Sequence, residues 1–252
     1  LMVSFSLLQL LFTPLWGRLS DRHGRRPILL ISLCGSTFSY VLFAFSRSFE
    51  LLLLSRVLAG ISAANITAAQ AYIADITSKE ERTAGMGLIG MAFGLGFSLG
   101  PVIGWLGQWL WKLLDPDVSP MHYHVGPALL AAAICGINLV WAYFGLPESL
   151  PRERRGKVSF KRFATTREAI AMLRHPVLGP LIILIFLVTF AFANVEVSFS
   201  LFAKSELGMD LPYGLFIYIG LVMAFTQGFL VRRLVTRIPE QTLMIYGAVL
   251  LV

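Results

Sequence analysis

Charged side chains are scarce in this sequence. They make up 14% of its 252 residues, whereas soluble globular domains carry about 25%. Hydrophobic residues reach 56%, and they gather in runs of spanning length. About 20 such residues cross a bilayer as a helix, and a helix pairs its backbone polar groups internally. The distribution excludes a soluble globular domain and predicts an all-α membrane protein.

Cysteine is equally rare, and so are the residue patterns of enzymes. Cys34 and Cys135 lie inside apolar runs, where we expect them to pack as small apolar residues without a disulfide. His122 and His124 form a close pair that no cysteine or third histidine joins, so we expect no metal site. The sequence has no nucleophile–base pair and no phosphate-binding loop. We therefore expect no enzyme activity and no cofactor.

Acidic residues are outnumbered, which gives a net charge of +7. Such a balance can indicate nucleic acid as a partner, but here the cations sit in short loops between apolar runs. Seventeen of the 21 Lys and Arg residues lie in one set of alternate loops, three lie in the other, and Arg56 lies within a span. Positive loops stay in the cytoplasm, so this asymmetry sets the orientation. We expect membrane lipid, and not nucleic acid, around the chain.

The apolar runs divide the chain into segments. We expect spans at about 1–17, 28–45, 51–74, 83–107, 125–146, 177–203 and 211–231, with an eighth cut off at 241–252. We predict an N-terminal bundle over 1–147, a central cytoplasmic linker over 148–176 and the start of a C-terminal bundle over 177–252. Because Leu1 is not methionine and the last run is too short to span, we expect an internal part of a longer chain.

The basic linker has two interpretations. Residues 161–175 place Phe163, Ile170 and Leu173 partly on one side, which is typical of a short helix on an anionic membrane surface. A solvated basic loop explains the same composition.

The first cytoplasmic loop has a distinctive pattern, Gly-x-x-x-Asp-Arg-x-Gly-Arg-Arg. Its residues are Gly17, Asp21, Arg22, Gly24, Arg25 and Arg26. The two glycines suit a tight turn between antiparallel spans. Asp21 lies among three arginines, so we expect it to pair with them or with a neighbouring helix end. The alternative is a basic loop that only sets topology.

This loop resembles the signature loop of the major facilitator superfamily, between its second and third helices. Two more patterns agree in register. Arg56-Val-Leu-Ala-Gly60 resembles the superfamily's Arg-x-x-x-Gly pattern in its fourth helix. Gly96-Phe-Ser-Leu-Gly100-Pro101-Val-Ile-Gly104 resembles the antiporter motif of its fifth helix. The resemblance implies a partial superfamily bundle that contains helices two to eight and part of nine.

These two patterns also carry physical expectations. A charge within a span costs a few kcal/mol, so Arg56 should face a cavity or a partner, or else reach toward the outer interface. Glycines four apart allow close helix packing, so we expect Gly96, Gly100 and Gly104 to face another helix. Pro101 should bend its helix.

Within the superfamily, the chain is most similar to drug:proton antiporters of the tetracycline-efflux type. The similar stretches are Ala71-Tyr72-Ile73-Ala74-Asp75-Ile76-Thr77, followed by Glu81-Arg82, and Leu146-Pro147-Glu148-Ser149. The resemblance implies that Asp21, Arg25 and Asp75 form a cytoplasmic charge cluster that locks the inner gate. Ser39 stands at or near the place where tetracycline exporters carry an intramembrane aspartate, which argues against tetracycline itself as the substrate.

Polar residues within spans are the candidates for the transport path. Glu196 lies deep in a span, and burial there would let it exchange a proton near neutral pH or pair with a cationic substrate. Alternatively, Asn194 or Ser198 holds it, or it lies at an aqueous helix end. The other candidates for the substrate cavity are Gln9, Asn65, Gln70, Asn138 and Asn194. Each of them serves equally well to bind helices together.

The predicted function is proton-driven efflux of a small, partly apolar compound by a monomer in the cell's inner membrane. One alternative is symport or uptake of a nutrient or organic anion, which needs the same loops but not the antiporter motif. Another is a membrane receptor or scaffold that no longer transports.

Overall fold

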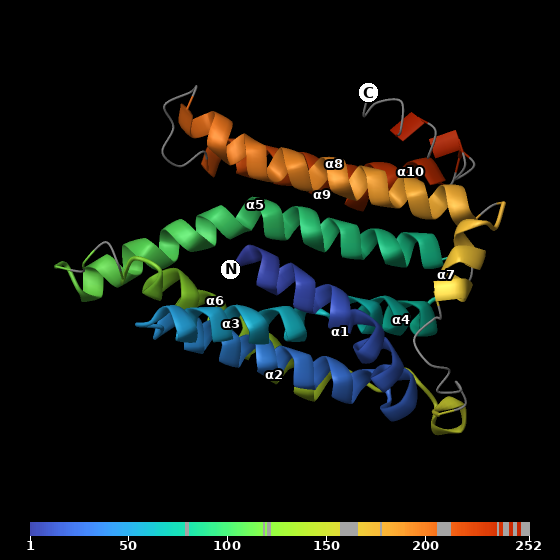
Figure 1. The fold of residues 1–252 in the computed structure, drawn as a ribbon, viewed down its shortest axis with the longest axis horizontal. Coiled ribbons are helices and arrows are strands. Elements are labelled where there is room, and N and C mark those ends of the chain that lie inside the picture. Colours follow the sequence, from blue (N-terminus) through green and yellow to red (C-terminus); the bar gives the residue numbers. More distant parts are fainter. Residues whose placement is uncertain are drawn as a thin grey trace. The chain divides into compact units, whose positions relative to one another are not determined.

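The computed structural model describes residues 1–252 except for 79–80, 118, 120–121, 157–165, 177, 206–212, 236, 239–241, 244–245 and 248–252. Within the described residues the chain is helical, with no strand, so the all-α prediction is confirmed (Figure 1). The chain divides into two compact units, one of residues 1–158 with 216–252 and the other of residues 159–215. This division rests on proximity in space, and the bundle boundaries predicted from the sequence stay a prediction.

The larger unit begins with six helices. They are α1 (Met2–His23), α2 (Arg25–Ala44), α3 (Phe49–Ala63), α4 (Ile66–Ile76), α5 (Arg82–Leu114) and α6 (Val125–Gly145). Helix α2 packs on α3 and α6, α1 packs on α3 and α4, and α5 packs on α6. A short 3-10 turn at Arg152–Arg154 follows α6. The end of α1, the start of α2 and the ends of α4 and α6 therefore belong to one packed unit.

The same unit also contains the end of the chain. Helix α9 (Tyr213–Phe225), which enters this unit at residue 216, continues into a π-helical turn at Thr226–Val231 and then α10 (Arg232–Val235). Helix α5 runs against this region. The smaller unit holds α7 (Thr166–Leu173) and α8 (Leu178–Ser205), which contact each other. The predicted short helix in the linker thus exists over part of its range, and residues 161–165 lie outside the described residues.

Apolar and polar side chains are distributed as in a membrane protein. Four of the described spans are long and apolar enough to cross a bilayer: Arg25–Ala44, Phe49–Ile76, Arg82–Leu114 and Val125–Gly145. Large apolar side chains point outward, with Phe144 82% and Trp141 76% exposed. The largest fully buried side chains are serines, among them Ser32 and Ser55. Small residues between helices and large ones outside are typical of packing in lipid, so the chain is a multi-pass membrane protein.

Two expected segments differ from the structure. The predicted loop at Gly17–Pro27 is helical except for Gly24, because α1 continues to His23 and α2 begins at Arg25. Gly17 therefore lies within α1 and not in a turn. The predicted span at 51–74 is two helices, α3 and α4, separated by a turn at Ala64 and Asn65. The side chains that support this break are described below.

Candidate functional site: a cytoplasmic charge cluster

Arg25 lies at the centre of a charge cluster that joins three helices. Its side chain is nearly buried, with 8% of the residue exposed. Its Nη1 lies 2.5 Å from Asp21 Oδ1 on α1, and its Nε lies 3.1 Å from Asp75 Oδ2 near the end of α4. Nη1 also donates to Ser20 Oγ over 2.7 Å. The predicted proximity of Asp21, Arg25 and Asp75 is confirmed, and a single guanidinium connects α1, α2 and α4.

Glu148 adds the segment after α6 to this cluster. Its Oε1 accepts a hydrogen bond of 2.8 Å from the backbone N–H of Arg25 and one of 3.1 Å from Leu150 N–H. Its Oε2 lies 3.3 Å from Nη2 of Arg155. A carboxylate at the first N–H of α2 satisfies a donor that has no partner within the helix and also complements the helix dipole. Glu148 therefore caps α2 from a part of the chain more than 120 residues away.

Gly24 is the residue that permits this cap. Its φ of 108° lies in a region that L side chains rarely adopt. A Cβ placed there would overlap Glu148 Oε2 and lie 2.8 Å from Glu148 Cδ. The glycine thus allows both the reversal of the chain and the close approach of the carboxylate.

Further bonds hold residues 148–156, the post-α6 segment, against the cluster. Ser149 Oγ donates to Asp75 Oδ2 over 3.3 Å. The N–H of Gly156 donates to the carbonyl oxygen of Asp21 over 3.3 Å, and Arg155 Nε donates to the carbonyl oxygen of Leu150 over 3.1 Å. Movement of the post-α6 segment would therefore break hydrogen bonds to Asp21, Arg25 and Asp75.

The remaining residues of the predicted gate serve separate helix ends. Arg82 Nη2 donates to the carbonyl oxygen of Ala74 over 3.1 Å, so it caps the C-terminal end of α4. Arg26 Nη2 donates to the carbonyl oxygen of Tyr143 over 2.6 Å. Arg22 lies in the last turn of α1. A Cβ on Gly17 would meet Thr67 Oγ1 at an ordinary 3.6 Å, so packing does not demand glycine there.

Arg56, on α3, packs against an aromatic ring near the C-terminal end of α2. Its guanidinium carbon is 4.1 Å from the ring centroid of Phe43, close enough for a cation–π interaction. Nη2 of Arg56 is buried and has no hydrogen-bond partner in the described part of the chain. The Phe43 ring thus supplies a partner for the charge of Arg56. Whether Arg56 also reaches the outer interface stays a prediction. Gly60 has a different task, because a Cβ there would lie 2.5 Å from the carbonyl oxygen of Phe5 where α1 crosses α3.

The break between α3 and α4 lies in the middle of a span, and side chains from α1 supply its missing hydrogen bonds. Trp16 Nε1 donates to the carbonyl oxygen of Ile61 over 2.6 Å, and Gln9 Nε2 donates to that of Ala63 over 3.3 Å. Asn65 Nδ2 donates to Ser32 Oγ on α2 over 2.5 Å. Non-helical backbone at membrane depth needs such partners. Gln9 and Asn65 therefore bind helices together, and a contact with substrate stays a prediction.

The other candidates for the substrate cavity are not brought together. Gln70 and Asn138 are exposed, on α4 and α6. Asn194 is exposed and donates to the carbonyl oxygen of Phe190, one turn earlier in α8, over 2.8 Å. Glu196 lies in α8, but its side chain is outside the described residues, so its predicted role stays a prediction.

The close packing expected for the glycine motif of α5 is not found among the described residues. A Cβ on Gly96, Gly100 or Gly104 would meet no described atom within 4 Å. The close approach occurs at Gly94, where a Cβ would lie 2.6 Å from the backbone nitrogen of Ala224. The reason is helix phase, because Gly96 lies two positions, or about 200°, from Gly94 around the helix. Pro101 lies within α5, which continues as one helix through it.

Sequence reasoning missed Glu148, Ser149 and Arg155 as members of the cluster. Glu148 and Ser149 belong to the Leu-Pro-Glu-Ser stretch that resembles the tetracycline exporters, and that stretch follows a span that we expect to end on the cytoplasmic side. The signal was therefore present as an acidic residue at the same membrane face. The described residues contain no cluster of histidine, cysteine or acidic side chains able to hold a metal ion.

Comparison with known proteins agrees with this architecture. The family model described as Major Facilitator Superfamily matches residues 1–252. Major facilitator superfamily domain-containing protein 10 of Bos taurus is 36% identical over 255 residues, which cover 91% of this chain and 52% of that protein. The class C tetracycline resistance protein of Escherichia coli is 40% identical over 155 residues, which cover 62% of this chain and 36% of that protein.

A solved structure is also similar. The crystal structure of the human organic anion transporter MFSD10 (TETRAN) aligns with a TM-score of 0.69 and 34% sequence identity, over 91% of this chain and 55% of that one. The bovine and human relatives match most of this chain, but this chain spans only about half of their length. Since the family model covers every residue, this chain belongs to the major facilitator superfamily.

Proposed function

We propose that the protein is a secondary active transporter that moves small, partly apolar compounds across the cell membrane in exchange for protons. The observation that carries the proposal is Arg25, held between Asp21 and Asp75 on different helices. Alternating access requires contacts at one membrane face that form and break as the bundles rock. A charge cluster that joins α1, α2, α4 and the post-α6 segment suits this task, and in our proposal it keeps the cytoplasmic side closed.

Exchange with protons follows from the resemblance of the sequence motifs to drug:proton antiporters, and similarity to a tetracycline resistance protein supports export of a drug-like compound. The glycine motif of α5 adds no physical support, since its three glycines meet no described helix. Glu196 is the proposed proton-coupling group, because it is the acidic residue deep within a span. We further propose that the protein works as a monomer.

A second candidate is transport of organic anions without proton exchange. The name of the human relative, an organic anion transporter, favours organic anions as the substrates. The two candidates share the gate and differ in what drives the substrate.

Transport by the full-length protein in proteoliposomes separates them. Vesicles are prepared with an acidic interior, and uptake of fluorescein, an organic anion, is compared with that of ethidium, an organic cation. If substrate is exchanged for protons, a probe should accumulate inside the vesicles and a protonophore should abolish this accumulation. The second candidate predicts fluorescein uptake that persists in the presence of the protonophore. If neither probe were taken up although the protein still bound them, a receptor or scaffold would be favoured.

The role of the cluster is tested with a matched pair of variants. A hydrogen bond between charged groups contributes about 1.5–3 kcal/mol, and the partial exposure of Asp21 reduces this value. We expect Asp21→Asn to lower the transport rate about tenfold, since about 1.4 kcal/mol corresponds to that factor. Asp117→Asn removes the same charge from an exposed position in the outer loop and should leave the rate unchanged. Equal rates for the two variants would contradict the proposed gate.

A further inference from the structure

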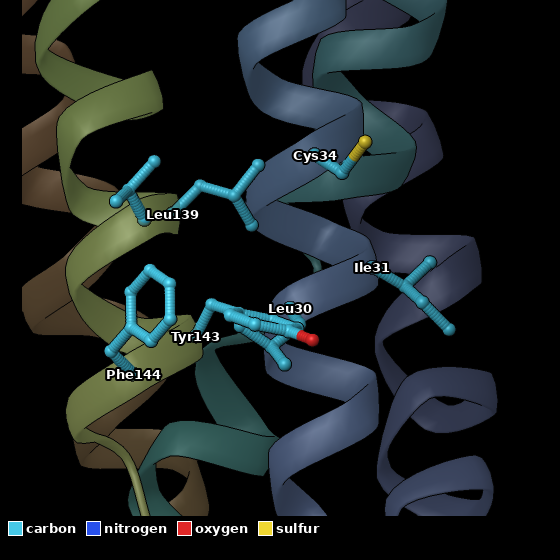
Figure 2. Close-up of a pocket in the computed structure, with 7 residues that line it drawn as sticks. Leu30, Ile31, Cys34, Leu139, Tyr143 and Phe144 are labelled. Atoms are coloured by element: carbon cyan, nitrogen blue, oxygen red, sulfur yellow. The ribbon is translucent and has the colours of Figure 1, made fainter.

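An apolar groove lies between α2 and α6. It has a volume of 430 Å³ and is lined by Leu30, Ile31, Cys34, Leu139, Val140, Tyr143 and Phe144. Figure 2 shows Leu139 and Tyr143 extending from α6 toward α2, with Phe144 beside Tyr143. The rings of Tyr143 and Phe144 meet edge to face, with centroids 5.2 Å apart.

The lining indicates an aliphatic occupant. Binding sites for small molecules combine apolar walls with a few converging polar groups that fix the orientation of the ligand. Here the walls are aliphatic or aromatic except for the Tyr143 hydroxyl and the Cys34 thiol. The walls are also open, since Ile31 is 56% and Val140 57% exposed. An open, apolar groove in a spanning region suits an acyl chain better than a polar solute.

A cation lies at one end of the groove. Arg26, in the first turn of α2, donates to the carbonyl oxygen of Tyr143, and its guanidinium carbon is 5.7 Å from the centroid of the Tyr143 ring. A guanidinium has five N–H donors, and it can hold a phosphate with two parallel hydrogen bonds. No carboxylate of the described residues forms an ion pair with Arg26, and its Nε is buried without an acceptor. The adjacent Arg25, in contrast, is committed to Asp21 and Asp75.

The end that carries Arg26 faces the cytoplasm. Arg26 belongs to the loop set that holds 17 of the 21 Lys and Arg residues. The cytoplasmic leaflet is the one that carries anionic lipids, and tyrosine is enriched where chains meet head groups. The positive end and the apolar body of the groove thus match the two parts of an anionic phospholipid.

We propose that the groove between α2 and α6 binds an acyl chain of an anionic phospholipid of the cytoplasmic leaflet, and that Arg26 holds its phosphate. The lipid would bridge α2 and α6 at Arg26, the residue that follows Arg25 of the charge cluster. It would therefore support the packing of α2 against α6, from which Glu148 reaches the cluster.

Native mass spectrometry of the full-length protein tests this site. Phosphatidylglycerol and phosphatidylcholine with identical acyl chains are titrated as probes, and the fraction of protein with one bound lipid is measured. We expect phosphatidylglycerol to bind more tightly to the wild-type protein. Arg26→Gln should weaken phosphatidylglycerol binding about fivefold and leave phosphatidylcholine binding unchanged, because one cation near an anionic lipid contributes about that factor.

Three further arms keep the test decisive. Arg26→Lys preserves the charge and should preserve most of the preference, and Val140→Trp fills the groove and should weaken binding of both lipids. Arg152→Gln removes an exposed cation from the same membrane face outside the groove lining, so the preference should persist. Equal losses in Arg152→Gln and Arg26→Gln would overturn the site in favour of diffuse attraction. If glycerol phosphate displaced bound phosphatidylglycerol as well as the whole lipid does, the lipid site would be overturned in favour of a simple anion site.

Discussion

Substitution of Gly24 by alanine should introduce both backbone strain and crowding at the charge cluster. At a φ of 108° and a ψ of 159°, a side chain occupies a region that is essentially restricted to glycine, at a cost of about 1–3 kcal/mol. The new Cβ would also overlap the Glu148 carboxylate, which must then leave the N–H of Arg25. Loss of that charged hydrogen bond adds about 1.5 kcal/mol. We expect Gly24→Ala to destabilise the protein by about 3 kcal/mol in total.

Two comparisons isolate the causes. Gly156 has a φ of 70° but a Cβ there would meet no described atom within 4 Å, so Gly156→Ala should cost only about 1 kcal/mol of strain. Glu148→Ala removes the crowded carboxylate, so the double variant Gly24→Ala with Glu148→Ala should be more stable than the sum of the single effects by about 1 kcal/mol. Thermal unfolding of the purified full-length protein measures all four variants. If Gly24→Ala unfolds like Gly156→Ala, or if the two effects simply add, the contact between Gly24 and Glu148 is not what the glycine serves.

Three other predictions concern the charge cluster, helix packing and proton coupling. Arg25→Gln leaves Asp21 and Asp75 without their cation and should cost about 2–3 kcal/mol, more than Arg25→Lys, as measured by thermal unfolding; equal losses would contradict the bridge. Gly94→Ala pushes a methyl group against the backbone of Ala224 and should lower the free energy of unfolding by about 1–3 kcal/mol, whereas Gly96→Ala should be nearly neutral. If Gly96→Ala were the more destabilising variant in thermal unfolding, the contact of α5 through Gly94 would be contradicted. Glu196→Gln should abolish proton-driven flux and its pH dependence in proteoliposomes, and unchanged flux would exclude Glu196 as the coupling group.

The amino-acid sequence determined the type of molecule and one feature of its site. Apolar runs predicted spanning helices because hydrocarbon offers no partner to an unpaired backbone group. Asp21 and Arg25 are only four residues apart, on either side of the turn at Gly24, and the ion pair expected from this spacing is present. The superfamily could also be recognised from these motifs, and the family model matches the whole chain.

Only the tertiary structure decided which of these residues meet. The glycine motif suggested a packed face, but the rotation of α5 relative to its neighbours selected Gly94 instead, and that rotation depends on side chains of other helices. The break at Ala64 and Asn65 has no local breaker such as proline, and it is sustained by Gln9 and Trp16 from α1. Glu148 joined the cluster because the end of α6 packs beside the start of α2, although more than 120 residues separate it from Arg25. The local sequence pattern determines where helices form and which residues close in sequence can meet. Contacts between helices that are distant in sequence depend on how all of the helix surfaces pack together.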